Sequence, residues 1–458
     1  MSQHATAYTP RNAWDVYATP EERTAIRALA ARYLQFISAC KTERETVDYV
    51  AARLMEAGYG NDFTSGKVML PLRGKCIFIA RRGTAPLSEG LHLIAAHADT
   101  PRLDFKQRPL IEQPGVAQAK THYYGGIRKY QWLARPLALH GVLIRSDGTT
   151  VRVRVGEDAG DPVFTIADLL PHLAQKQNTQ TVADAFEAEK LNVILGHSPL
   201  PTADGDAPGE PIKGQLLDIL LRKYDVREED FVSAEMQAVP AGEARFVGLD
   251  EALLGGYGQD DRICVFAALE ALLTAEEPRH TVALMFWDKE EIGSDGATGA
   301  SSSFLRYCME DVAAAWGEGA RISQIMLATR ALSADVNAAL DPDHQEVHEK
   351  QNAAMLGFGP CFCKFTGSRG KYGASEADAE LLGWLRGMYN RLNIPWQIAE
   401  CGRVDQGGGG TVALFLAAHG MQVIDFGPAL LGMHSPFELS SAVDLFATVR
   451  AYRAFLEA

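Results

Sequence analysis

Several short runs of apolar residues without polar alternation occur along the chain, a pattern typical of strands that are buried on both faces. The clearest runs are residues 91–96, 281–287 and 421–426, and residues 68–70 and 76–81 predict two further strands around a turn. Patterns of helical period lie between these runs. The alternation of strands and helices predicts an α/β fold with a largely buried sheet.

Helices are predicted where a capping residue precedes an apolar pattern of helical period. Thr19-Pro20-Glu21-Glu22 begins one such helix, and a second, over residues 42–57, ends at Gly58. Further helices are expected after Arg262 and over residues 165–177, 297–307 and 412–419.

The pattern of apolar and polar residues changes between residues 104 and 247. Residues 136–155 form two alternating apolar and polar runs around Ser146-Asp147-Gly148, which is a strong hairpin signal. We therefore predict an inserted, mainly antiparallel β domain over residues 104–247, between catalytic segments 1–103 and 248–458. An antiparallel sheet has edges that need covering, so we expect this insert to act as a dimerisation domain.

Composition and charge narrow the class of protein. The chain has 458 residues, 47% of them hydrophobic and 22% charged, as in an ordinary globular protein of more than one domain. A net charge of −14 argues against nucleic acid or an anionic membrane as a partner, and no apolar run reaches membrane-spanning length. The first residues show no secretory signal, and the seven scattered cysteines suit reduced thiols, so we expect a cytoplasmic protein.

Acidic residues and histidines follow several of the apolar runs. They are Asp288-Lys289-Glu290-Glu291, His97-Ala98-Asp99, Asp260 in a glycine-rich loop, Asp335 and His434. Open α/β sheets place their chemistry at the carboxyl ends of strands. Taken singly, each feature has an ordinary explanation, such as a solvated acidic turn, a packed histidine or an Asp that caps a helix.

Taken together, these residues favour a catalytic metal site. Imidazoles and carboxylates, with no cysteine among them, suit catalytic rather than structural zinc. A carboxylate shared by two metals would make a two-metal hydrolase centre. Of the adjacent Glu290 and Glu291, one could hold a metal while the other accepts a proton from the water that the metal activates.

The motifs together resemble the aspartyl aminopeptidase family of metallopeptidases, in a divergent branch of bacterial type. The likeness covers nearly the whole chain, and Asp288-Lys289-Glu290-Glu291-Ile292-Gly293-Ser294 is its most specific part. The other motifs that carry it are His97-Ala98-Asp99-Thr100-Pro101, Asp260 with the helix after it, Ser333-Ala334-Asp335 and Met433-His434-Ser435. The resemblance implies a zinc-exopeptidase-like mixed sheet flanked by helices.

The resemblance also implies roles for single residues. One zinc ion would be held by His97, Asp260 and Asp335, and the other by Asp260, Glu291 and His434. Glu290 would be the general base, and Asp99 would orient His97. Two Zn²⁺ ions per chain are expected, with Co²⁺ or Mn²⁺ as alternatives.

Three further residues take roles from the resemblance. His172, in Pro171-His172-Leu173-Ala174, would enter the active site of a neighbouring subunit. Lys364 and Met433 would contact the peptide substrate. Members of the family typically assemble from dimers into dodecamers, so we expect a homo-oligomer.

The chain departs from the family pattern near the expected substrate site. Trp132-Leu133-Ala134-Arg135-Pro136-Leu137 lacks two acids of the usual motif, Asp261 replaces Asn, and glycines occupy residues 407–410. A preference for N-terminal Asp or Glu is therefore not carried over. We expect a di-zinc aminopeptidase that acts on short peptides. The alternatives are a related two-metal amidohydrolase or deacylase acting on small N-acyl compounds, and a non-catalytic assembly protein.

Overall fold

The computed structural model describes residues 7–201, 209–317 and 319–458. The chain forms two compact units. Unit 1 comprises Met1–Asp99, Ala244–Met433 and Phe437–Ala458, and unit 2 comprises Thr100–Glu243 and His434–Pro436. Unit 2 thus includes most of the insert predicted for residues 104–247, together with a short C-terminal segment that the sequence pattern does not assign to it.

An eight-stranded mixed sheet forms the centre of unit 1. In spatial order its strands are β1 (Lys67–Leu72), β2 (Cys76–Arg81), β12 (Thr281–Trp287), β3 (Leu91–His97), β13 (Arg330–Ser333), β19 (Gln422–Gly427), β15 (Cys361–Cys363) and β17 (Gln397–Ile398). Strands β12, β3, β13 and β19 are parallel, while β2 and β15 pair antiparallel with their neighbours in this group. Every residue of β12 and β3 is buried, as their unbroken apolar runs predict.

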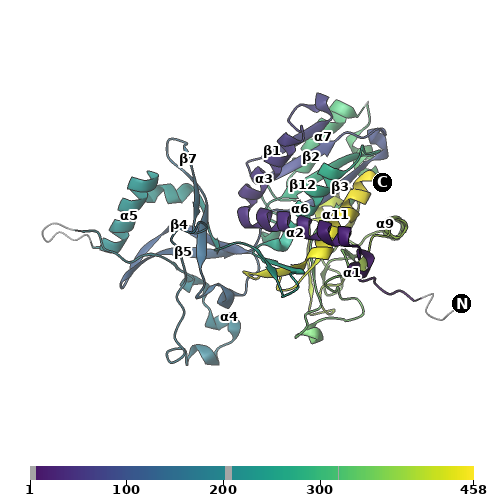
Figure 1. Ribbon diagram of the computed structural model, residues 1–458. Coiled ribbons are helices and arrows are strands. Elements are labelled where there is room, and N and C mark those ends of the chain that lie inside the picture. The colour runs from purple at the N-terminus through teal and green to yellow at the C-terminus, as the bar shows by residue number, and fades with distance from the viewer. Residues whose placement is uncertain (1–6, 202–208, 318) are drawn as a thin grey trace. The chain divides into compact units, whose positions relative to one another are not determined.

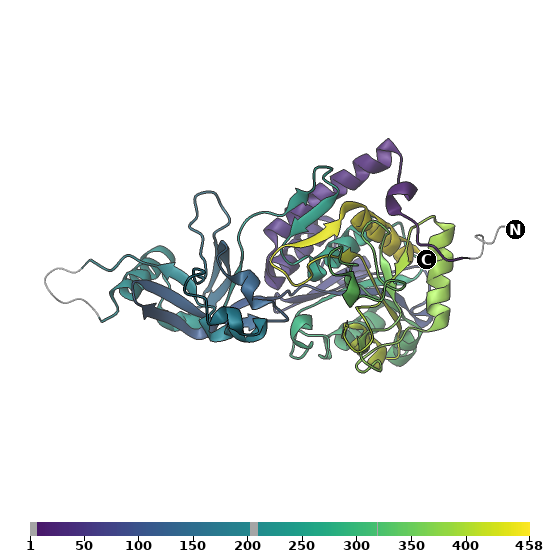
Figure 2. The same ribbon diagram turned by 90° about the horizontal axis from the view of Figure 1, so that it is seen from below.

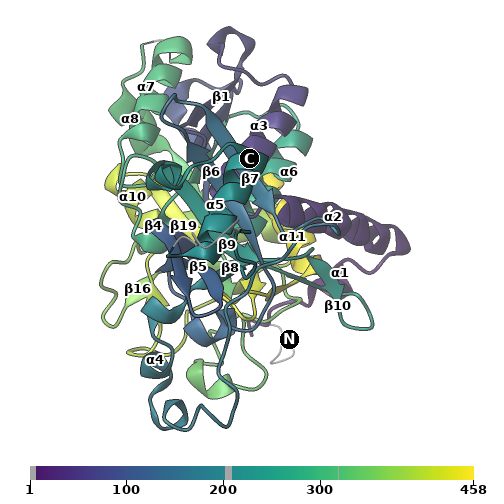
Figure 3. The ribbon, with the colours of Figure 1, turned by 90° about the vertical axis from the view of Figure 1, so that its left-hand side faces the viewer.

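Helices cover both faces of this sheet, which confirms the predicted α/β class. The α-helices of unit 1 are α1 (Ala13–Val16), α2 (Pro20–Ala39), α3 (Glu43–Glu56), α6 (Gln259–Thr274), α7 (Phe304–Trp316), α8 (Ile322–Ala328), α9 (Ala379–Arg391), α10 (Ala413–Ala418) and α11 (Ala442–Glu457). Figure 3 shows α7, α8 and α10 along one side of unit 1 and α2, α3, α6 and α11 along the other. Alternate residues of β3 enter two hydrophobic clusters, Ile94 and Ala96 in one and Leu93 and Ala95 in the other.

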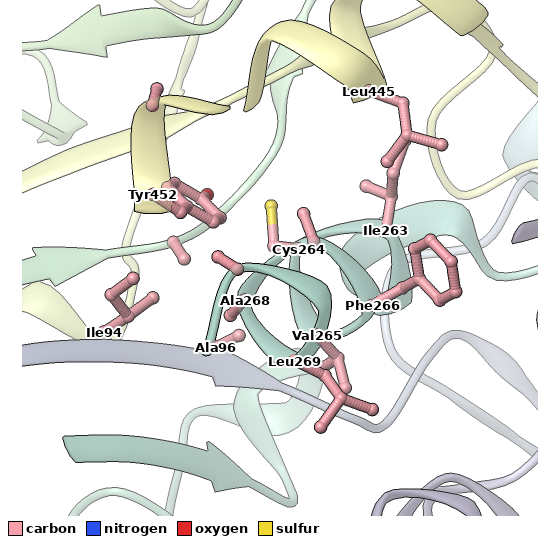
Figure 4. Close-up of a cluster of buried hydrophobic side chains, with 14 of the residues drawn as sticks. Ile94, Ala96, Ile263, Cys264, Val265, Phe266, Ala268, Leu269, Leu445 and Tyr452 are labelled. Carbon is pink, nitrogen blue, oxygen red and sulfur yellow. The ribbon is translucent and has the colours of Figure 1, made fainter. Parts of the chain in front are cut away.

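The packing of α6 against the sheet matters for the site, because α6 follows directly on the predicted metal loop. Ala268 of α6 lies toward Ile94 and Ala96 of β3, and Cys264 of α6 and Tyr452 of α11 belong to the same buried group (Figure 4). The small side chains of Ala96 and Ala268 let the helix approach the strand closely. The start of α6 is thereby held at a fixed position beside the end of β3.

The long helices α2 and α11, from opposite ends of the chain, pack against each other (Figures 1 and 2). The N-terminus of α2 is stabilised by a capping box, in which the side chains of Thr19 and Glu22 each accept a hydrogen bond from the other residue's backbone N–H. Helix α3 begins with the same arrangement at Thr42 and Glu45. Both helix starts agree with the sequence pattern.

The helix predicted from residue 297 begins later, at Phe304. Residues before it form turns because Ser294 O accepts hydrogen bonds from both the backbone N–H and the hydroxyl of Ser301, at 3.2 and 2.8 Å. Gly299 lies so close to this turn that a Cβ there would be 2.1 Å from Ser294 O. The chain therefore folds back on itself before the helix starts.

Short sheets join the loops of unit 1. Their strands are β10 (Arg245–Val247), β11 (Leu253–Gly256) and β21 (Glu438–Ser441) in one sheet, β14 (Asn337–Ala338) and β20 (Ala429–Leu430) in a second, and β16 (Gly367–Ser368) and β18 (Gly408–Gly409) in a third. The first sheet leads from β11 into α6. The third links the loop after β15 to the glycine-rich loop before α10.

Unit 2 is built on a six-stranded antiparallel sheet. Its strands in spatial order are β7 (Thr150–Val155), β6 (Leu137–Ile144), β9 (Ala234–Pro240), β4 (Arg102–Gln113), β5 (Val116–Tyr124) and β8 (Val193–Gly196). The β6–β7 hairpin is the one predicted around Ser146-Asp147-Gly148. Helix α5 (Pro211–Tyr224) packs on β4, β5 and β8, and α4 (Val182–Ala185) is a single short turn (Figure 1).

The helix predicted for residues 165–177 is wrong. Residues 171–173 form a turn, and the helical conformation is limited to the 3-10 helix Gln177–Thr179. Pro171 explains the difference, because it has no N–H to donate and it disfavours a helical residue before it. Leu169, Leu170 and Leu173 are 52%, 51% and 67% exposed, so they do not bury the neighbouring His172.

Two further predictions from the sequence concern reduced cysteines and membrane-spanning segments. All seven cysteines are free thiols, and Cys401 is the exposed one among them. No helix within the described ranges is long and apolar enough to cross a membrane.

Candidate metal centre

His97 is the last residue of β3, and its imidazole is fixed from both sides. Nδ1 lies 3.0 Å from the backbone oxygen of Asp99 and 3.3 Å from Asp99 Oδ1. Nε2 lies 3.2 Å from Asp260 Oδ1. The whole residue is 1% exposed. An imidazole that is held at Nδ1 presents Nε2 as a ligand atom.

Asp260 reaches the same place from the first turn of α6, just after the loop that joins β11 to α6, and its own backbone is not helical. Gly258 adopts a φ of +71° in this loop, where a Cβ would collide with the guanidinium of Arg262. The Glu438 carboxylate accepts the backbone N–H groups of Gln259, at 2.5 Å, and Asp260, at 3.3 Å. The backbone that carries the Asp260 carboxylate is therefore tied to β21.

Asp335 lies two residues beyond the end of β13. The N–H of Ala334 donates to Ala95 O at 2.7 Å, so β13 stays beside β3 up to the site. Asp335 Oδ1 is 4.0 Å from His97 Nε2. The possible ligand atoms of His97, Asp260 and Asp335 lie within 4.8 Å of one another, and all three residues are buried.

The Asp99 carboxylate organises the loop that follows β12. Its two oxygens accept the backbone N–H groups of Glu290, at 3.1 Å, and Glu291, at 3.2 Å. Lys289 before them has a φ of +72°, and the short 3-10 helix Glu290–Ile292 follows. Asp99 is fully buried, so this one carboxylate fixes both the His97 ring and the backbone of the glutamate pair.

The two adjacent glutamates differ in what their carboxylates approach. Glu290 Oε2 lies 3.9 Å from His97 Nε2. The carboxylate of Glu291 has an oxygen within 4.8 Å of an Asp260 carboxylate oxygen. His434, the remaining predicted ligand, belongs to unit 2, where its Nδ1 lies 2.9 Å from Gly126 O.

Burial and neighbouring charges shift the pKa values at this site. Burial lowers the pKa of His97, but its hydrogen bonds with Asp260 and Asp99 outweigh this effect and hold the pKa well above the ordinary value. Burial raises the pKa of Asp335 well above its usual range, and the charge of Asp261 raises it further. Carboxylates that burial and mutual repulsion keep from ionising are favourable places for a cation.

The residues present fit a zinc ion. One imidazole nitrogen and two carboxylates form a donor set of the catalytic type, without cysteine. The Nδ1 atom of the imidazole is already engaged by Asp99, as is usual for a histidine that ligates a metal. Asp261 Oδ1, beside this group, is buried without a hydrogen-bond partner among the described residues, so one more carboxyl oxygen at this place lacks a protein donor.

The other predicted functional residues lie outside this cluster of buried side chains. Lys364 follows β15, and its 46%-exposed side chain has Nζ 3.8 Å from Glu376 Oε1. Met433 is half-buried and packs against a hydrophobic cluster of unit 1. His172 is exposed on unit 2. Their roles stay predictions from the family resemblance.

Sequence reasoning missed two buried acids near the site. Glu438, which holds the Asp260 loop, is 1% exposed, and Asp425 of β19 is 3% exposed. The signal for Asp425 is visible in the sequence, because it is the one charged residue within the apolar run 421–426. Glu438 has no such signal, since its partners are backbone groups far away in the chain.

The chain matches known proteins over nearly its whole length. Residues 36–456 match the family model described as aminopeptidase I zinc metalloprotease (M18). A protein of Clostridium acetobutylicum described as a "probable M18 family aminopeptidase 1" is 45% identical over 458 residues, which cover 97% of this chain and 98% of the relative.

Solved structures show the same fold. The crystal structure of an M18 family aminopeptidase from Thermotoga maritima has a TM-score of 0.93 and 44% identity, with 98% of this chain and 100% of that chain covered. The S. cerevisiae mApe1 dodecamer has a TM-score of 0.73 and 21% identity, with 93% and 95% covered. At this lower identity the likeness concerns the fold alone.

Proposed function

The chain belongs to the M18 family of zinc aminopeptidases, which are metallopeptidase hydrolases, and from this membership we propose that it is a di-zinc enzyme that releases the N-terminal residue of short peptides. The observation that carries the proposal is the buried group of His97, Asp260 and Asp335, with the Glu290 carboxylate 3.9 Å from the imidazole Nε2. This group combines ligand atoms with an adjacent base.

We assign one zinc to His97, Asp260 and Asp335, and the second to Asp260, Glu291 and His434. Zinc ions in such a centre supply Lewis-acid activation of water and of the scissile carbonyl. Asp99 holds His97 in the orientation that presents Nε2, and the same carboxylate holds the backbone of Glu291. The assignment of His434 rests on the family pattern.

Glu290 is the proposed general base and acid. Its carboxylate accepts a proton from the attacking water and passes it to the amine that leaves as the peptide bond breaks. Asp99 accepts the backbone N–H of Glu290, which fixes the point from which this side chain extends. Glu290 is a better candidate than Glu291 because its carboxylate lies beside the His97 imidazole and is not needed in the proposed ligand set.

The decisive experiment combines metal analysis with a substrate screen. Purified protein should contain about two zinc ions per chain, and it should release N-terminal residues from unblocked peptides. Asp260→Ala should lose both ions, since its carboxylate is shared. Activity on N-acylated compounds but not on free-amine peptides would favour the amidohydrolase alternative, and a metal-loaded protein without any turnover would favour a non-catalytic role.

We further propose that the chain works as a homo-oligomer in which unit 2 pairs subunits and His172 acts in a neighbouring active site. The apolar side chains around His172 are exposed and would be covered by a neighbouring subunit. An imidazole donor at that place could stabilise the negative oxygen of the tetrahedral intermediate. Assembly into a dodecamer, as in the S. cerevisiae mApe1 structure, and a cytoplasmic location belong to this proposal.

A further inference from the structure

Arg262 is a fully buried cation that follows the proposed bridging ligand Asp260 by two positions in α6. The residue is 0% exposed. Burying a charged group costs free energy unless the group is paired or hydrogen-bonded. The contacts of its guanidinium indicate what this side chain contributes in return.

The guanidinium donates three hydrogen bonds within the described chain, all of them to backbone oxygens. Nε donates to Gly258 O at 2.8 Å, and Nη2 donates to Tyr257 O at 3.1 Å. Nη1 donates to the carbonyl oxygen of Cys40, at the C-terminal end of α2. The last carbonyls of a helix lack partners within the helix and carry partial negative charge, which favours a cation at this place. Arg262 therefore joins the end of α2 to the two residues before Gln259.

The backbone before Asp260 is shaped around this guanidinium. Gly258 has a φ of +71°, and a Cβ there would lie 1.6 Å from Arg262 Nη2. The guanidinium carbon lies 5.4 Å from the centre of the Tyr257 ring, within the range of a cation–π contact. A side chain at position 258 would therefore exclude the guanidinium from the place where it binds both carbonyls.

Regular helical geometry does not fix Asp260. Asp260, with φ −79° and ψ 109°, and Asp261, with φ −114° and ψ 24°, both depart from the helical conformation inside the first turn of α6. Side chains hold this segment instead. The Glu438 carboxylate accepts the N–H groups of Gln259 and Asp260, and Arg262 donates to the carbonyls of the two residues before them. Residues 257–260 are thus held through carbonyl groups in their first half and through N–H groups in their second half.

The side chain of Gln259 adds to this support. Its Nε2 donates to Leu254 O at 3.0 Å and to Glu438 O at 2.6 Å. Its Oε1 accepts the hydroxyl of Ser440 at 2.5 Å and the hydroxyl of Tyr33 at 3.2 Å. The two donors and two acceptors of the amide are all used. The anchors of this segment therefore lie in α2, β11 and β21, and each of them is a protein group.

We infer that Arg262 is a positioning residue that sets residues 257–260 in place before any metal binds. This inference rests on the proposed function, because that function assigns the Asp260 carboxylate to both zinc ions. A ligand that is already in position loses less conformational freedom when the ions bind. Because Asp260 is shared, loss of the Arg262 contacts should weaken both zinc sites together, whereas His97→Ala should weaken one of them.

The wild-type protein gives the first test. In metal-free protein, amide hydrogen exchange of Gln259 and Asp260 should already be slow, and added zinc should not slow it further relative to the amides of β12. The β12 amides report any general effect of zinc on stability. If zinc itself organised the segment, the two amides would exchange fast without zinc and slow down when it is added. That result would overturn the inference.

Arg262→Lys gives the second test. Lysine keeps the positive charge but lacks the planar fork that reaches three separate oxygens. Both zinc dissociation constants, measured by titration against a competing chelator, should rise roughly ten- to a hundredfold. At saturating Co²⁺ the visible absorption spectrum should still differ from that of wild type, because saturation removes differences in affinity and leaves differences in ligand geometry. Exchange of Gln259 and Asp260 in the metal-free variant should accelerate.

Arg81→Lys is the matched control. Arg81 Nη1 donates to Ala275 O at 3.0 Å, at the C-terminal end of the same helix. The control thus alters a bond of the same kind, from a guanidinium to a backbone oxygen, at the opposite end of α6. Its zinc dissociation constants, its Co²⁺ spectrum and the exchange of Gln259 and Asp260 should all match wild type, even where its stability falls.

Several outcomes would contradict the role of Arg262. Wild-type zinc affinity in Arg262→Lys is one, and an equal loss of affinity in Arg81→Lys is another. Weakening of a single zinc site would show that Arg262 does not act through the shared Asp260. If Arg262→Lys does not fold, the exchange of the wild-type amides with and without zinc decides the inference. A wild-type protein that binds no zinc would count against the proposed function, while exchange in the metal-free proteins still decides whether Arg262 holds this segment.

Discussion

Asp444 offers a direct test of how burial controls ionisation in this fold. It lies in the first turn of α11, fully buried, and its two oxygens accept the N–H groups of Gly357 and Gly359, each at 2.7 Å. Burial raises its pKa to about 7, and these two hydrogen bonds oppose the rise without cancelling it. We predict that Asp444→Asn removes a pH dependence of stability that the wild-type protein shows.

The sign and size of this effect follow from the pKa difference. The folded-state pKa of about 7 exceeds the ordinary value of 3.8, so the folded chain binds this proton more tightly than the unfolded chain. The resulting stability is fully present below about pH 4 and is lost as the pH rises through about 7. The shift corresponds to roughly 4 kcal/mol. Asn presents one acceptor to two N–H groups, which costs about 1–3 kcal/mol at every pH.

Urea unfolding of wild type and Asp444→Asn between pH 4.5 and 8 measures this difference. The variant should be the less stable protein at pH 4.5, and the free-energy gap should shrink or reverse toward pH 8. Because the two units need not unfold together, amide exchange of α11 gives a second, local measure. Asp311→Asn, which removes an exposed carboxylate from α7, is the control, and its difference from wild type should not vary with pH. A gap between wild type and Asp444→Asn that stays constant across this range would refute the reasoning.

Three other predictions test the proposed site. Glu290→Gln keeps the shape of the side chain and removes the base. Its kcat should therefore fall by roughly two to four orders of magnitude, while its metal content is unchanged. Loss of metal from Glu290→Gln but not from Glu291→Gln would show that the two glutamates have the opposite roles. His97→Ala should lose the zinc shared with Asp335, measured by metal analysis, and full retention would contradict the ligand assignment. Mixing inactive His172→Ala and Glu290→Gln subunits under exchange conditions should restore activity if the histidine acts in trans, and no recovery would show that it acts within its own chain.

Burial explains which parts of the fold could be predicted from the sequence. Strands β12 and β3 are covered on both faces by helices, so each is an unbroken apolar run with clear ends. The helix prediction for the segment around His172 was wrong for the opposite reason. Its leucines have a spacing compatible with a helix, but Pro171 prevents the helical hydrogen bonds, and the leucines are exposed. An apolar pattern indicates burial, yet it does not distinguish burial in a helix from an apolar surface.

The proposed metal ligands were accessible to sequence reasoning because the ends of neighbouring parallel strands meet at one edge of the sheet. His97 and Asp335 illustrate this, since each lies at or just after the end of a predicted apolar run. The supporting contacts were not accessible. Asp99 and Glu438 accept backbone N–H groups from residues more than a hundred positions away. A backbone N–H donor cannot be recognised from the type of residue that carries it, so the sequence does not indicate these contacts.

The carboxylates that support the proposed metal centre divide two tasks between them. Around His97 the carboxylates of Asp99, Asp260, Asp261, Glu290 and Asp335 gather near a single imidazole. Mutual repulsion and burial oppose this arrangement, and divalent cations would provide more positive charge than the single imidazole can carry. A cation alone does not select one geometry among several. Asp99 and Glu438 do so, because each carboxylate accepts two consecutive backbone N–H groups. Asp99 accepts those of Glu290 and Glu291, and Glu438 accepts those of Gln259 and Asp260. Charge compensation and backbone positioning are thus separate tasks, carried by different carboxylates of the same site.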